Sequence, residues 1–480
     1  MPSSFTQYSL SKEILEALEQ LQYHTPTPVQ AQVIPEILAG RDVLAKSQTG
    51  SGKTASFGIP LCQLVNWNEN KPQALVLAPT RELAMQVKED IFHIGRYKRI
   101  NVPVLFGRSP FYRQAQALRQ KTHIVVGTPG RVLDHMQRKT LDTSGIRYLV
   151  IDEADEMLNM GFLEQVKAII AYLPEHPVTL LFSATMPKEI ERLAQTYLQN
   201  PARVEIQAQT VTVDRISQTS FCVSEGDKLR LLEDVLVLQN PESGIVFCNT
   251  KEKVDVVHGY LTDSGIPCGK LHGGMEQDDR IAIMNQFRRG NFRYLIATDV
   301  AARGIDIDHV THVVNFDMPR AKEHYVHRIG RTGRNGRRGI AVTFYTKEEA
   351  NAAKDLQAYI GCRWLYVVAP TQTLVERYRP TFEETLRRRP EFKPEKGAMF
   401  SSSITKIHIN AGRKTKLRPV DIVGTICSIK GVTSSDIGII DVQSVSTFVD
   451  VLHNKGALVM KALQNKPIKG KTRRITKIEV

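Results

Sequence analysis

The sequence predicts an α/β fold: two parallel-sheet domains in series, followed by a smaller α+β domain. Short apolar runs alternate with helical stretches over residues 1–368. Such runs, each ended by a polar or Gly/Pro turn, are typical of strands buried on both faces of a parallel sheet. They form two series, one before and one after the polar stretch 207–218. The residues after about 400 differ from both series in element order and in charge.

The apolar runs are the expected strands of the two sheets, and residues at their carboxyl ends are candidates for function. The first series consists of DVLA (42–45), ALVLAP (74–79), HIVVGTP (123–129), YLVIDEAD (148–155) and TLLFSAT (179–185). The second consists of GIVFCNT (244–250), YLIATD (294–299) and HVVNFDMP (312–319). We therefore divide this part of the chain into a first domain, 1–206, and a second domain, 207–368.

The stretch 369–402 is expected to be a basic linker or exposed extension, because TLRRRPEFKPEKG is rich in proline and charge. The chain then reads strand, helix, strand, strand, helix, strand, at 406–412, 420–431, 437–442, 446–451, 456–464 and 473–480. This order within 403–480 predicts the ferredoxin-like arrangement of RNA-recognition (RRM-type) modules. Many unrelated functions share that fold, so the order alone does not establish one.

Composition narrows the class of protein further. The chain has 480 residues, 42% hydrophobic and 24% charged, which excludes disordered, collagen-like and disulfide-scaffold proteins. No apolar run is long enough to span a membrane, so we expect a cytoplasmic protein without membrane contact. The six cysteines are scattered, which indicates reduced packing residues and no metal cluster.

The net charge of +14 is concentrated at one end of the chain. Residues 401–480 contain 14 basic and 5 acidic residues, a balance of +9. Residues 1–206 and 207–368 are close to neutral. The excess predicts a polyanion-binding domain appended to a nearly neutral body, although a solvated basic surface would look the same.

A phosphate-binding loop is predicted between the strand DVLA and a helix. Its residues are Ser47 followed by Gln48-Thr49-Gly50-Ser51-Gly52-Lys53-Thr54. The glycines let backbone N–H groups approach phosphate oxygens, Lys53 can reach the β and γ phosphates, and Thr54 can ligate Mg²⁺. Ser47 stands at the first glycine of the strict pattern, so an ordinary glycine-rich turn is the alternative.

Asp152-Glu153-Ala154-Asp155 ends a strand about a hundred residues later. Asp152 can hold the metal, and Glu153 can orient the attacking water. An acidic helix start is the alternative for this segment alone. Together with Lys53 and Thr54 upstream, the pair indicates a nucleoside triphosphatase.

Over residues 1 to about 368 the sequence resembles the DEAD-box RNA helicases. The matching segments occur in family order and include Pro79-Thr80-Arg81-Glu82-Leu83-Ala84, Thr128-Pro129-Gly130-Arg131, Ser183-Ala184-Thr185, Ala297-Thr298-Asp299 and His327-Arg328-Ile329-Gly330-Arg331-Thr332-Gly333-Arg334. The resemblance implies two RecA-like domains that close on ATP, Mg²⁺ and single-stranded RNA. It implies an RNA-dependent ATPase that unwinds RNA locally.

Site roles follow from the same resemblance. Gln30 would select adenine, with Phe5 and Tyr23 as aromatic supports. Arg331 and Arg334 would be arginine fingers, and Ser183 and Thr185 would couple hydrolysis to domain closure. Asp306, in Arg303-Gly304-Ile305-Asp306, would contact the ribose. The RNA-binding face would comprise Arg81, Arg108, Thr128, Arg131, Asn249, Gly273, Gln277, Arg280 and Thr298. The chain departs from the family at Gln22 and Arg108, where other members usually have glycine.

The appended domain resembles the RNA-binding domain of the DbpA-type subfamily, which implies a hairpin of 23S ribosomal RNA as partner and a role in ribosome biogenesis on the large subunit. The usual aromatic pattern of RNA-recognition strands is absent, with His408 and Phe448 as ring candidates. Recognition is instead expected from basic residues: Arg413, Lys414, Lys416, Arg418, Lys466, Lys469, Lys471, Arg473 and Arg474.

Two alternatives stay open at this stage. A DNA helicase would use the same catalytic machinery on another polymer, and contacts to the 2′-hydroxyl distinguish the two. A non-catalytic RNA clamp would not need Glu153. We expect a monomer that hydrolyses ATP and is held near its target by the C-terminal domain.

Overall fold

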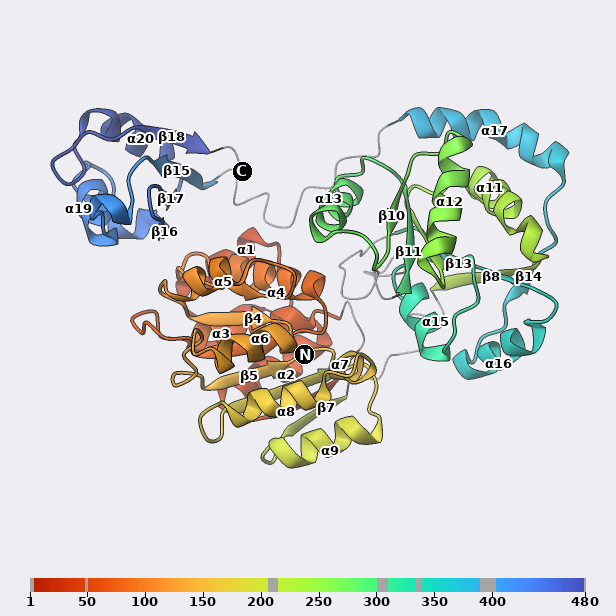
Figure 1. Cartoon of the computed structure of the whole chain (residues 1–480), viewed down its shortest axis with the longest axis horizontal. Helices are drawn as coiled ribbons and strands as arrows, with labels where there is room; N and C mark the ends of the chain where they lie inside the picture. Colours follow the sequence, from red (N-terminus) through yellow and green to blue (C-terminus); the bar gives the residue numbers. More distant parts are fainter. Residues whose placement is uncertain are drawn as a thin grey trace. The chain divides into compact units, whose positions relative to one another are not determined.

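The computed structural model describes residues 4–47, 51–205, 215–299, 310–333, 338–388 and 403–478. Three domains follow one another along the chain, two with parallel sheets and one with an antiparallel sheet (Figure 1). Among these residues no helix combines the length and the apolar character that a membrane span requires. All six cysteines are free, and Cys62 and Cys248 are buried as packing residues.

The first domain has a sheet whose described strands run in the order β3-β4-β2-β5-β6-β1-β7, all parallel. Its strands are β1 (Val43–Lys46), β2 (Ala74–Leu77), β3 (Val104–Leu105), β4 (Ile124–Gly127), β5 (Tyr148–Ile151), β6 (Val178–Ser183) and β7 (Ala202–Glu205). Its helices are η1 (Phe5–Tyr8), α1 (Lys12–Gln20), α2 (Pro28–Leu38), α3 (Lys53–Leu64), α4 (Arg81–Ile94), α5 (Phe111–Leu118), α6 (Pro129–Gln137), α7 (Ala154–Asn159), α8 (Leu163–Ala171) and α9 (Lys188–Tyr197).

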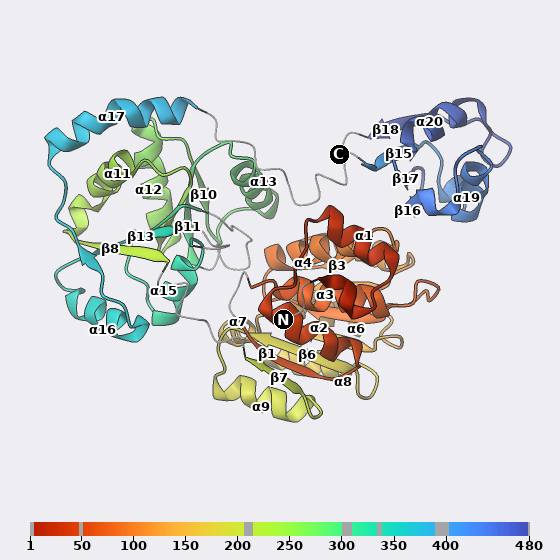
Figure 2. The same ribbon diagram turned by 180° about the vertical axis from the view of Figure 1, so that it is seen from behind.

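Alternate strand residues face opposite sides of this sheet, which gives two separate cores. Helices α1 to α4 pack on one face, against residues such as Val76 and Phe182. Helices α6 to α9 pack on the other, against residues such as Leu75 and Leu181. Figure 2 shows the sheet between the helices from behind. The five apolar runs predicted as strands are all strands, because burial on both faces requires continuous apolar sequence.

The second domain repeats this architecture with the strand order β10-β11-β9-β12-β13-β8-β14 among its described residues. Its strands are β8 (Ile216–Cys222), β9 (Gly244–Cys248), β10 (Cys268–Leu271), β11 (Tyr294–Thr298), β12 (His312–Asn315), β13 (Gly339–Tyr345) and β14 (Leu365–Tyr366). Its helices are η2 (Glu225–Asp227), α11 (Lys228–Gln239), α12 (Lys251–Asp263), α13 (Gln277–Arg288), α15 (Lys322–Ile329), α16 (Ala350–Ile360) and α17 (Gln372–Arg387). Helices α11, α12 and α17 cover one face, and α13, α15 and α16 the other.

The interpretation of 369–402 as a linker is wrong for its first half. Residues Gln372–Arg387 form α17, whose Val375 and Phe382 are buried in the core beneath α11. Proline and charge misled the prediction because the charged residues occupy the outer side of an amphipathic helix, and Pro380 is tolerated inside it. Residues 389–402 lie outside the described part of the chain.

The C-terminal domain is an antiparallel sheet in the order β16-β17-β15-β18 with two helices on one face. Its elements are β15 (Thr405–Ile409), η3 (Arg413–Thr415), α19 (Pro419–Cys427), η4 (Ser434–Asp436), β16 (Ile437–Val442), β17 (Thr447–Val451), α20 (Gly456–Asn465) and β18 (Ile475–Ile478). This is the predicted β-α-β-β-α-β order. The residues Ile407, Val449 and Val451 point into the core with α19 and α20, so both helices of this domain lie on one face of its sheet.

Candidate functional sites

The first candidate site lies where β1 and β5 end in the first domain. Helix α3 begins at Lys53, preceded by Gly52 at φ 90°, in the left-handed region that favours glycine. A Cβ at Gly52 would lie 2.6 Å from Gln30 Nε2, so a larger residue would displace the Gln30 side chain in addition to straining the backbone. The backbone is thereby exposed beside the start of a helix, an arrangement suited to phosphate oxygens.

Lys53 is only 6% exposed, and its Nζ makes no hydrogen bond to any residue that the structure describes. Asp152, 2% exposed, follows β5, and its Oδ1 accepts a hydrogen bond from the backbone N–H of Glu153 at 3.0 Å. Burial raises the pKa of Asp152, and Lys53 opposes that rise. A buried amine without a hydrogen-bond acceptor and a carboxylate with a raised pKa form a site that fits a polyanion with its cation.

Gln30 connects two parts of this site. Its Oε1 accepts from the Thr27 N–H at 2.9 Å, which completes a capping box at the start of α2. Its Nε2 donates to the Gly52 carbonyl at 3.2 Å, while Thr27 Oγ1 donates to the Ser51 carbonyl at 2.9 Å. The segment predicted to read adenine therefore touches the predicted phosphate loop. Phe5 is buried in the adjoining core, and Tyr23 packs against it.

Asp155 joins the end of β5 to the end of β6. Its Oδ2 accepts from both the backbone N–H and Oγ1 of Thr185, each at 2.8 Å. Ser183 Oγ accepts from the Asp155 N–H at 3.3 Å and donates to the Thr185 carbonyl at 2.6 Å. Asp155 was missed as a site residue, although it stands in the quoted Asp152–Asp155 segment. Ser183 and Thr185 are thus bound to Asp155 in the first turn of α7, which begins directly after Glu153.

The second candidate site lies where β9, β11 and β12 end in the second domain, around the buried Arg328 of α15. Its Nε and Nη2 donate to the two carboxylate oxygens of Asp299 at 2.6 and 2.7 Å. Nη2 also donates to Asn249 Oδ1 at 2.9 Å, and Nη1 donates to the Asp317 carbonyl at 2.7 Å and to Asn315 Oδ1 at 3.4 Å. All five N–H groups of the guanidinium are therefore used.

This arrangement stabilises the ionised form of the Asp299 carboxyl group. Burial alone would raise its pKa, but hydrogen bonds from Arg328 and His324 outweigh burial and lower it. Arg331 follows one turn after Arg328, is 5% exposed, and its N–H donates to the Arg328 carbonyl at 3.1 Å. The backbone at Arg331 is therefore anchored to the Arg328 cluster, defined as Arg328 with Asp299, Asn249, Asn315 and Asp317.

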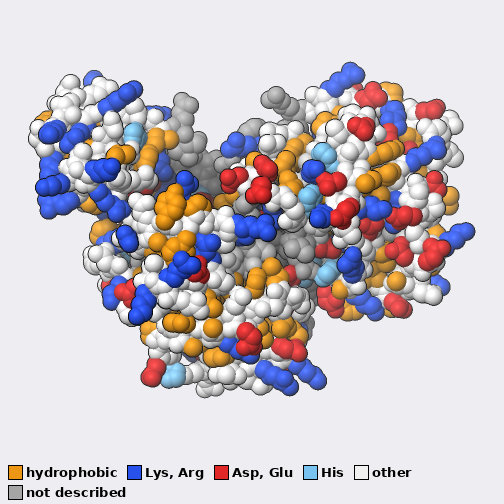
Figure 3. Space-filling view, viewed as in Figure 1, with side chains coloured by type: hydrophobic (Ala, Val, Ile, Leu, Met, Phe, Trp, Pro, Cys, Tyr) orange, Lys and Arg blue, Asp and Glu red, His pale blue; other side chains and the backbone are white. Residues whose placement is uncertain are grey.

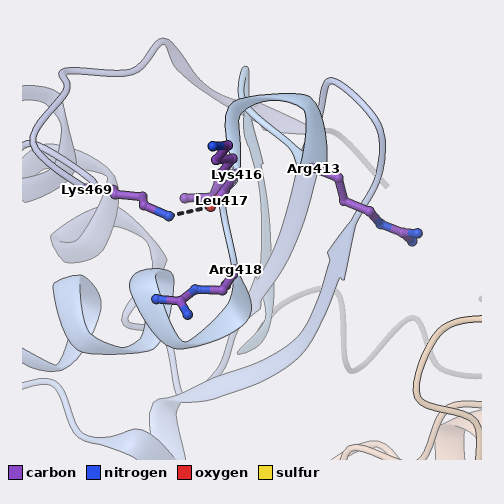
Figure 4. Close-up of a pocket in the computed structure, with 5 residues that line it drawn as sticks. All are labelled: Arg413, Lys416, Leu417, Arg418 and Lys469. Atoms are coloured by element: carbon purple, nitrogen blue, oxygen red, sulfur yellow. Dashed lines mark hydrogen bonds between the residues drawn. The ribbon is translucent and has the colours of Figure 1, made fainter.

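The third candidate site is a shallow depression of about 510 Å³ on the C-terminal domain, lined by Arg413, Lys416, Leu417, Arg418 and Lys469 (Figure 4). The Asp421 carboxylate lies 3.3 Å from Lys469 Nζ and 3.5 Å from Arg418 Nη2. Hydrogen bonding to the Arg418 backbone, to Arg418 and to Lys469 lowers the pKa of Asp421. Two of the four lining cations thus pair with Asp421, whereas Arg413 points away from Arg418 and Lys469 (Figure 4). Lys and Arg predominate on the visible face of this domain (Figure 3).

Family models match the three domains in order. Residues 27–193 match the DEAD/DEAH box helicase model, 227–336 the helicase conserved C-terminal domain, and 406–477 the DbpA RNA binding domain. The ATP-dependent RNA helicase DbpA of Bacillus subtilis is 53% identical over 475 residues, which covers 99% of each chain. The chain belongs to the DEAD-box helicase family.

Other relatives support this assignment. The DEAD-box ATP-dependent RNA helicase CshA of Geobacillus kaustophilus is 42% identical and covers 82% of each chain. Saccharomyces cerevisiae Dbp5 bound to RNA and ADP BeF3 is 33% identical, with a TM-score of 0.71 over 80% of this chain and 100% of that one. The protein is therefore an RNA-dependent ATPase with two RecA-like domains and a DbpA-type RNA-binding domain, as the sequence predicted.

The two positions at which the helicase departs from the family pattern share one backbone feature. Gln22 has φ 58° and Arg108 has φ 57°, so both occupy the left-handed region where glycine is favoured. Arg108 is exposed, and a Cβ at the preceding Gly107 would lie 3.5 Å from Arg81 Nη2. Arg81 and Arg108, both predicted RNA contacts, therefore belong to one surface.

Two predicted RNA contacts of the helicase are already bound within the protein. Arg131 Nη1 donates to the Ser109 carbonyl at 2.9 Å and to Gln114 Oε1 at 3.0 Å. Gln114 in turn contacts the buried His135, whose pKa is lowered to about 4 by burial and by Arg131. Asn249 Nδ2 donates to the Met318 carbonyl at 2.8 Å, and its Oδ1 accepts from Arg328. In this structure both side chains hold the loops that would meet RNA.

The other predicted positions are distributed as follows. Thr54, Arg81, Thr128, Arg280 and Thr298 are partly buried, and Gly273 is exposed. Gln277 begins α13, but its side chain lies outside the described part. Thr49, Gly50, Gly304, Asp306 and Arg334 also lie outside it. In the C-terminal domain, Lys414, Lys471 and Arg473 are not among the residues that line the depression. The roles of all these residues stay predictions.

The C-terminal sheet places its two ring candidates together. His408 on β15 pairs with Phe448 on β17, with ring centroids 5.2 Å apart. Both are partly buried, on the face of the sheet opposite α19 and α20, so Phe448 is not a core residue. This small aromatic pair could support one base, whereas the cations of the depression suit phosphates.

Proposed function

We propose that this DEAD-box helicase opens short RNA duplexes close to a hairpin of 23S ribosomal RNA, during assembly of the large ribosomal subunit. The observation that carries the proposal is the cation-lined depression within the segment that matches the DbpA RNA binding domain. Its four cations contribute to the +9 balance of residues 401–480. Targeting thus belongs to the C-terminal domain, and a cytoplasmic, monomeric protein remains the accompanying prediction.

ATP hydrolysis is proposed at the first site. Lys53 would donate to the β and γ phosphates, because its buried Nζ lacks an acceptor among the described residues. Thr54 and Asp152 would hold Mg²⁺, which neutralises phosphate charge when it is bound. Glu153 would orient the attacking water. Arg331 and Arg334 would supply charge from the second domain to the transferring phosphoryl group.

The proposal is tested by phosphate release on a panel of 23S ribosomal RNA fragments. Each fragment is matched by a shuffled RNA of equal length and by DNA of the same sequence. We expect one hairpin-containing fragment to stimulate at far lower concentration than its shuffled control, and DNA to stimulate weakly. Equal stimulation by all RNA fragments would contradict targeting, and equal stimulation by DNA would contradict RNA selectivity.

A variant tests whether the cation-lined depression is responsible for the preference for hairpin RNA. Arg418→Ala removes a lining cation that is exposed, so folding should be unaffected. Lys461→Ala is the matched control, because Lys461 is exposed on α20 and is not a lining residue. We expect Arg418→Ala to raise the concentration of hairpin RNA needed for half-maximal stimulation and Lys461→Ala to leave it unchanged. Equal effects of the two variants would point to general charge instead of a site.

A further inference from the structure

A buried lysine outside all the family motifs quoted above stands at the start of α11. Lys228 is 2% exposed, and its Nζ lies 2.7 Å from Glu225 Oε2 and 3.7 Å from Asp317 Oδ1. The Glu225 side chain is about half exposed, whereas that of Asp317 is 13% exposed. A buried ammonium requires compensation by charge. Asp317 is therefore its partner on the inner side.

The other carboxylate oxygen of Asp317 reaches the end of β9. Asp317 Oδ2 accepts from the backbone N–H of Asn249 at 2.9 Å. The Asp317 carbonyl accepts from Arg328 Nη1 at 2.7 Å. A continuous series of polar contacts thus leads from Lys228 through Asp317 to Asn249, the residue after β9, and to the Arg328 cluster.

This series ends at groups with a proposed role in RNA binding. Asn249 and Thr298 follow or end the neighbouring strands β9 and β11, and Arg328 bonds to Asn249 and to Asp299 beside Thr298. The side-chain amide of Asn249 is bound on both its nitrogen and its oxygen. RNA binding at this point should therefore depend on the backbone position at the end of β9, because the Asn249 side chain is already bound within the protein.

We propose that Lys228 is a positioning residue for RNA binding. Its charge holds the Asp317 carboxylate in the orientation that fixes the backbone at Asn249, and it does not touch RNA or ATP. This inference rests on the proposed RNA role of the β9 end. It is independent of hairpin targeting, because the test below uses an unstructured RNA.

The test is the RNA dependence of ATP hydrolysis with oligouridine. Lys228→Met keeps the aliphatic stem and removes the charge. We expect the oligouridine concentration for half-maximal stimulation to rise roughly fivefold while kcat at saturating RNA changes by less than about twofold, since only binding geometry is lost. Lys270→Met is the control, because Lys270 forms a surface ion pair with Asp255 at 2.6 Å in the same domain.

A double-mutant cycle separates positioning from a general structural role. Asp317→Asn keeps an oxygen that can accept from Asn249 and removes the charge that Lys228 orients. If Lys228 acts through Asp317, the double variant Lys228→Met/Asp317→Asn will be no worse in half-saturation than the worse single variant. Additive effects would overturn the proposal.

Two further results would overturn it. One is a loss of kcat at unchanged half-saturation, which is what a general loss of structure produces. The other is an equal rise in half-saturation for Lys270→Met. Thermal unfolding of each variant is recorded alongside, and if Lys228→Met does not fold, Asp317→Asn alone must still raise half-saturation without lowering kcat.

Discussion

The two α/β domains place opposite electrostatics at equivalent edges of similar sheets. In the first domain the buried Lys53 Nζ has no hydrogen-bond acceptor among the described residues, and burial raises the pKa of the neighbouring Asp152. In the second domain every N–H of the buried Arg328 is accepted, and its bonds lower the pKa of Asp299. At the first edge a buried N–H donor lacks an acceptor among the described residues, whereas at the second edge every guanidinium N–H has one.

This difference between the two sheet edges corresponds to two tasks: the first edge binds a ligand, and the second holds residues in a fixed arrangement. A site that must take up ATP keeps a buried hydrogen-bond donor without an acceptor, at a cost to stability, because the ligand will supply the acceptor. A cluster that must hold Arg331 and the strand ends in one arrangement is best satisfied internally. The predictions below test this contrast, beginning with the largest expected effect.

Glu153→Gln tests whether the first edge is catalytic. Glu153 is 9% exposed and has φ 50°, and glutamine keeps its size without the carboxylate. We expect phosphate release to fall on the order of a thousandfold, the range for loss of a general base, with ATP binding retained. Phosphate release and binding of a fluorescent ATP analogue measure the two quantities. Near-normal turnover would show that Glu153 is not the group that orients water.

Arg328→Met tests whether the second edge is held by a complete cluster. Removing the guanidinium leaves the buried Asp299 with only His324 as a partner in the described part of the chain, which should cost about 3 to 5 kcal/mol of the free energy of unfolding. The second domain contains Trp364, which is buried, and the first contains Trp67. Urea unfolding followed by Trp364 fluorescence in a Trp67→Phe background isolates the second domain. A loss below about 1 kcal/mol would mean that the cluster is not a stabilising unit.

Lys53→Met tests the converse at the first edge. Because Lys53 Nζ is buried without an acceptor among described residues, its replacement should leave the free energy of unfolding unchanged or raise it by about 1 kcal/mol. ATP binding should be lost in the same variant. Unfolding is followed by Trp67 fluorescence in a Trp364→Phe background. A clear destabilisation would show that Lys53 is already paired in the free protein and would remove the contrast between the edges.

The pH dependence of stability should have opposite signs in the two domains. With a raised pKa for Asp152, the native state binds more protons than the unfolded state, so stability falls as pH rises through the window between the two pKa values. With a lowered pKa for Asp299, the unfolded state binds more protons, so stability is lost as pH falls toward the folded-state pKa. Each pKa unit of difference corresponds to about 1.4 kcal/mol.

The same two tryptophan backgrounds measure this effect between pH 3 and 7. Asp152→Asn should remove the fall in the first domain, and Asp299→Asn should remove the loss in acid in the second. Parallel pH profiles in the two domains would contradict the difference in charge compensation. Unchanged profiles in both variants would show that other groups control the titration.

Much of the fold was predictable, because a strand buried on both faces must be apolar throughout. Strand β8 was missed since its sequence ISQTSFC alternates polar residues whose partners lie far along the chain. Gln218 Oε1, for example, accepts from Tyr325 and from Trp364 Nε1. Helix α17 was missed for a related reason, as only its packing on α11 shows that Val375 and Phe382 are core residues.

The candidate sites, like the fold, were predictable from the sequence only in part. Motif order identified Lys53, Asp152 and Glu153, because phosphate and metal binding require specific residue types at strand ends. The Arg328 cluster was not predictable, since its acceptors come from three strands that are separated in sequence. Asp155 and Lys228 act through contacts across the fold, and no local pattern marks them.

The five occupied donors of Arg328 also bear on how this protein tolerates mutation. No other side chain offers five N–H groups in one plane, so every substitution leaves at least one buried acceptor without a donor. In a library scored only for folded protein, position 328 should accept almost nothing, whereas position 53 should accept apolar residues freely. Variants inactive at position 53 would then persist as folded, RNA-binding competitors of the active enzyme.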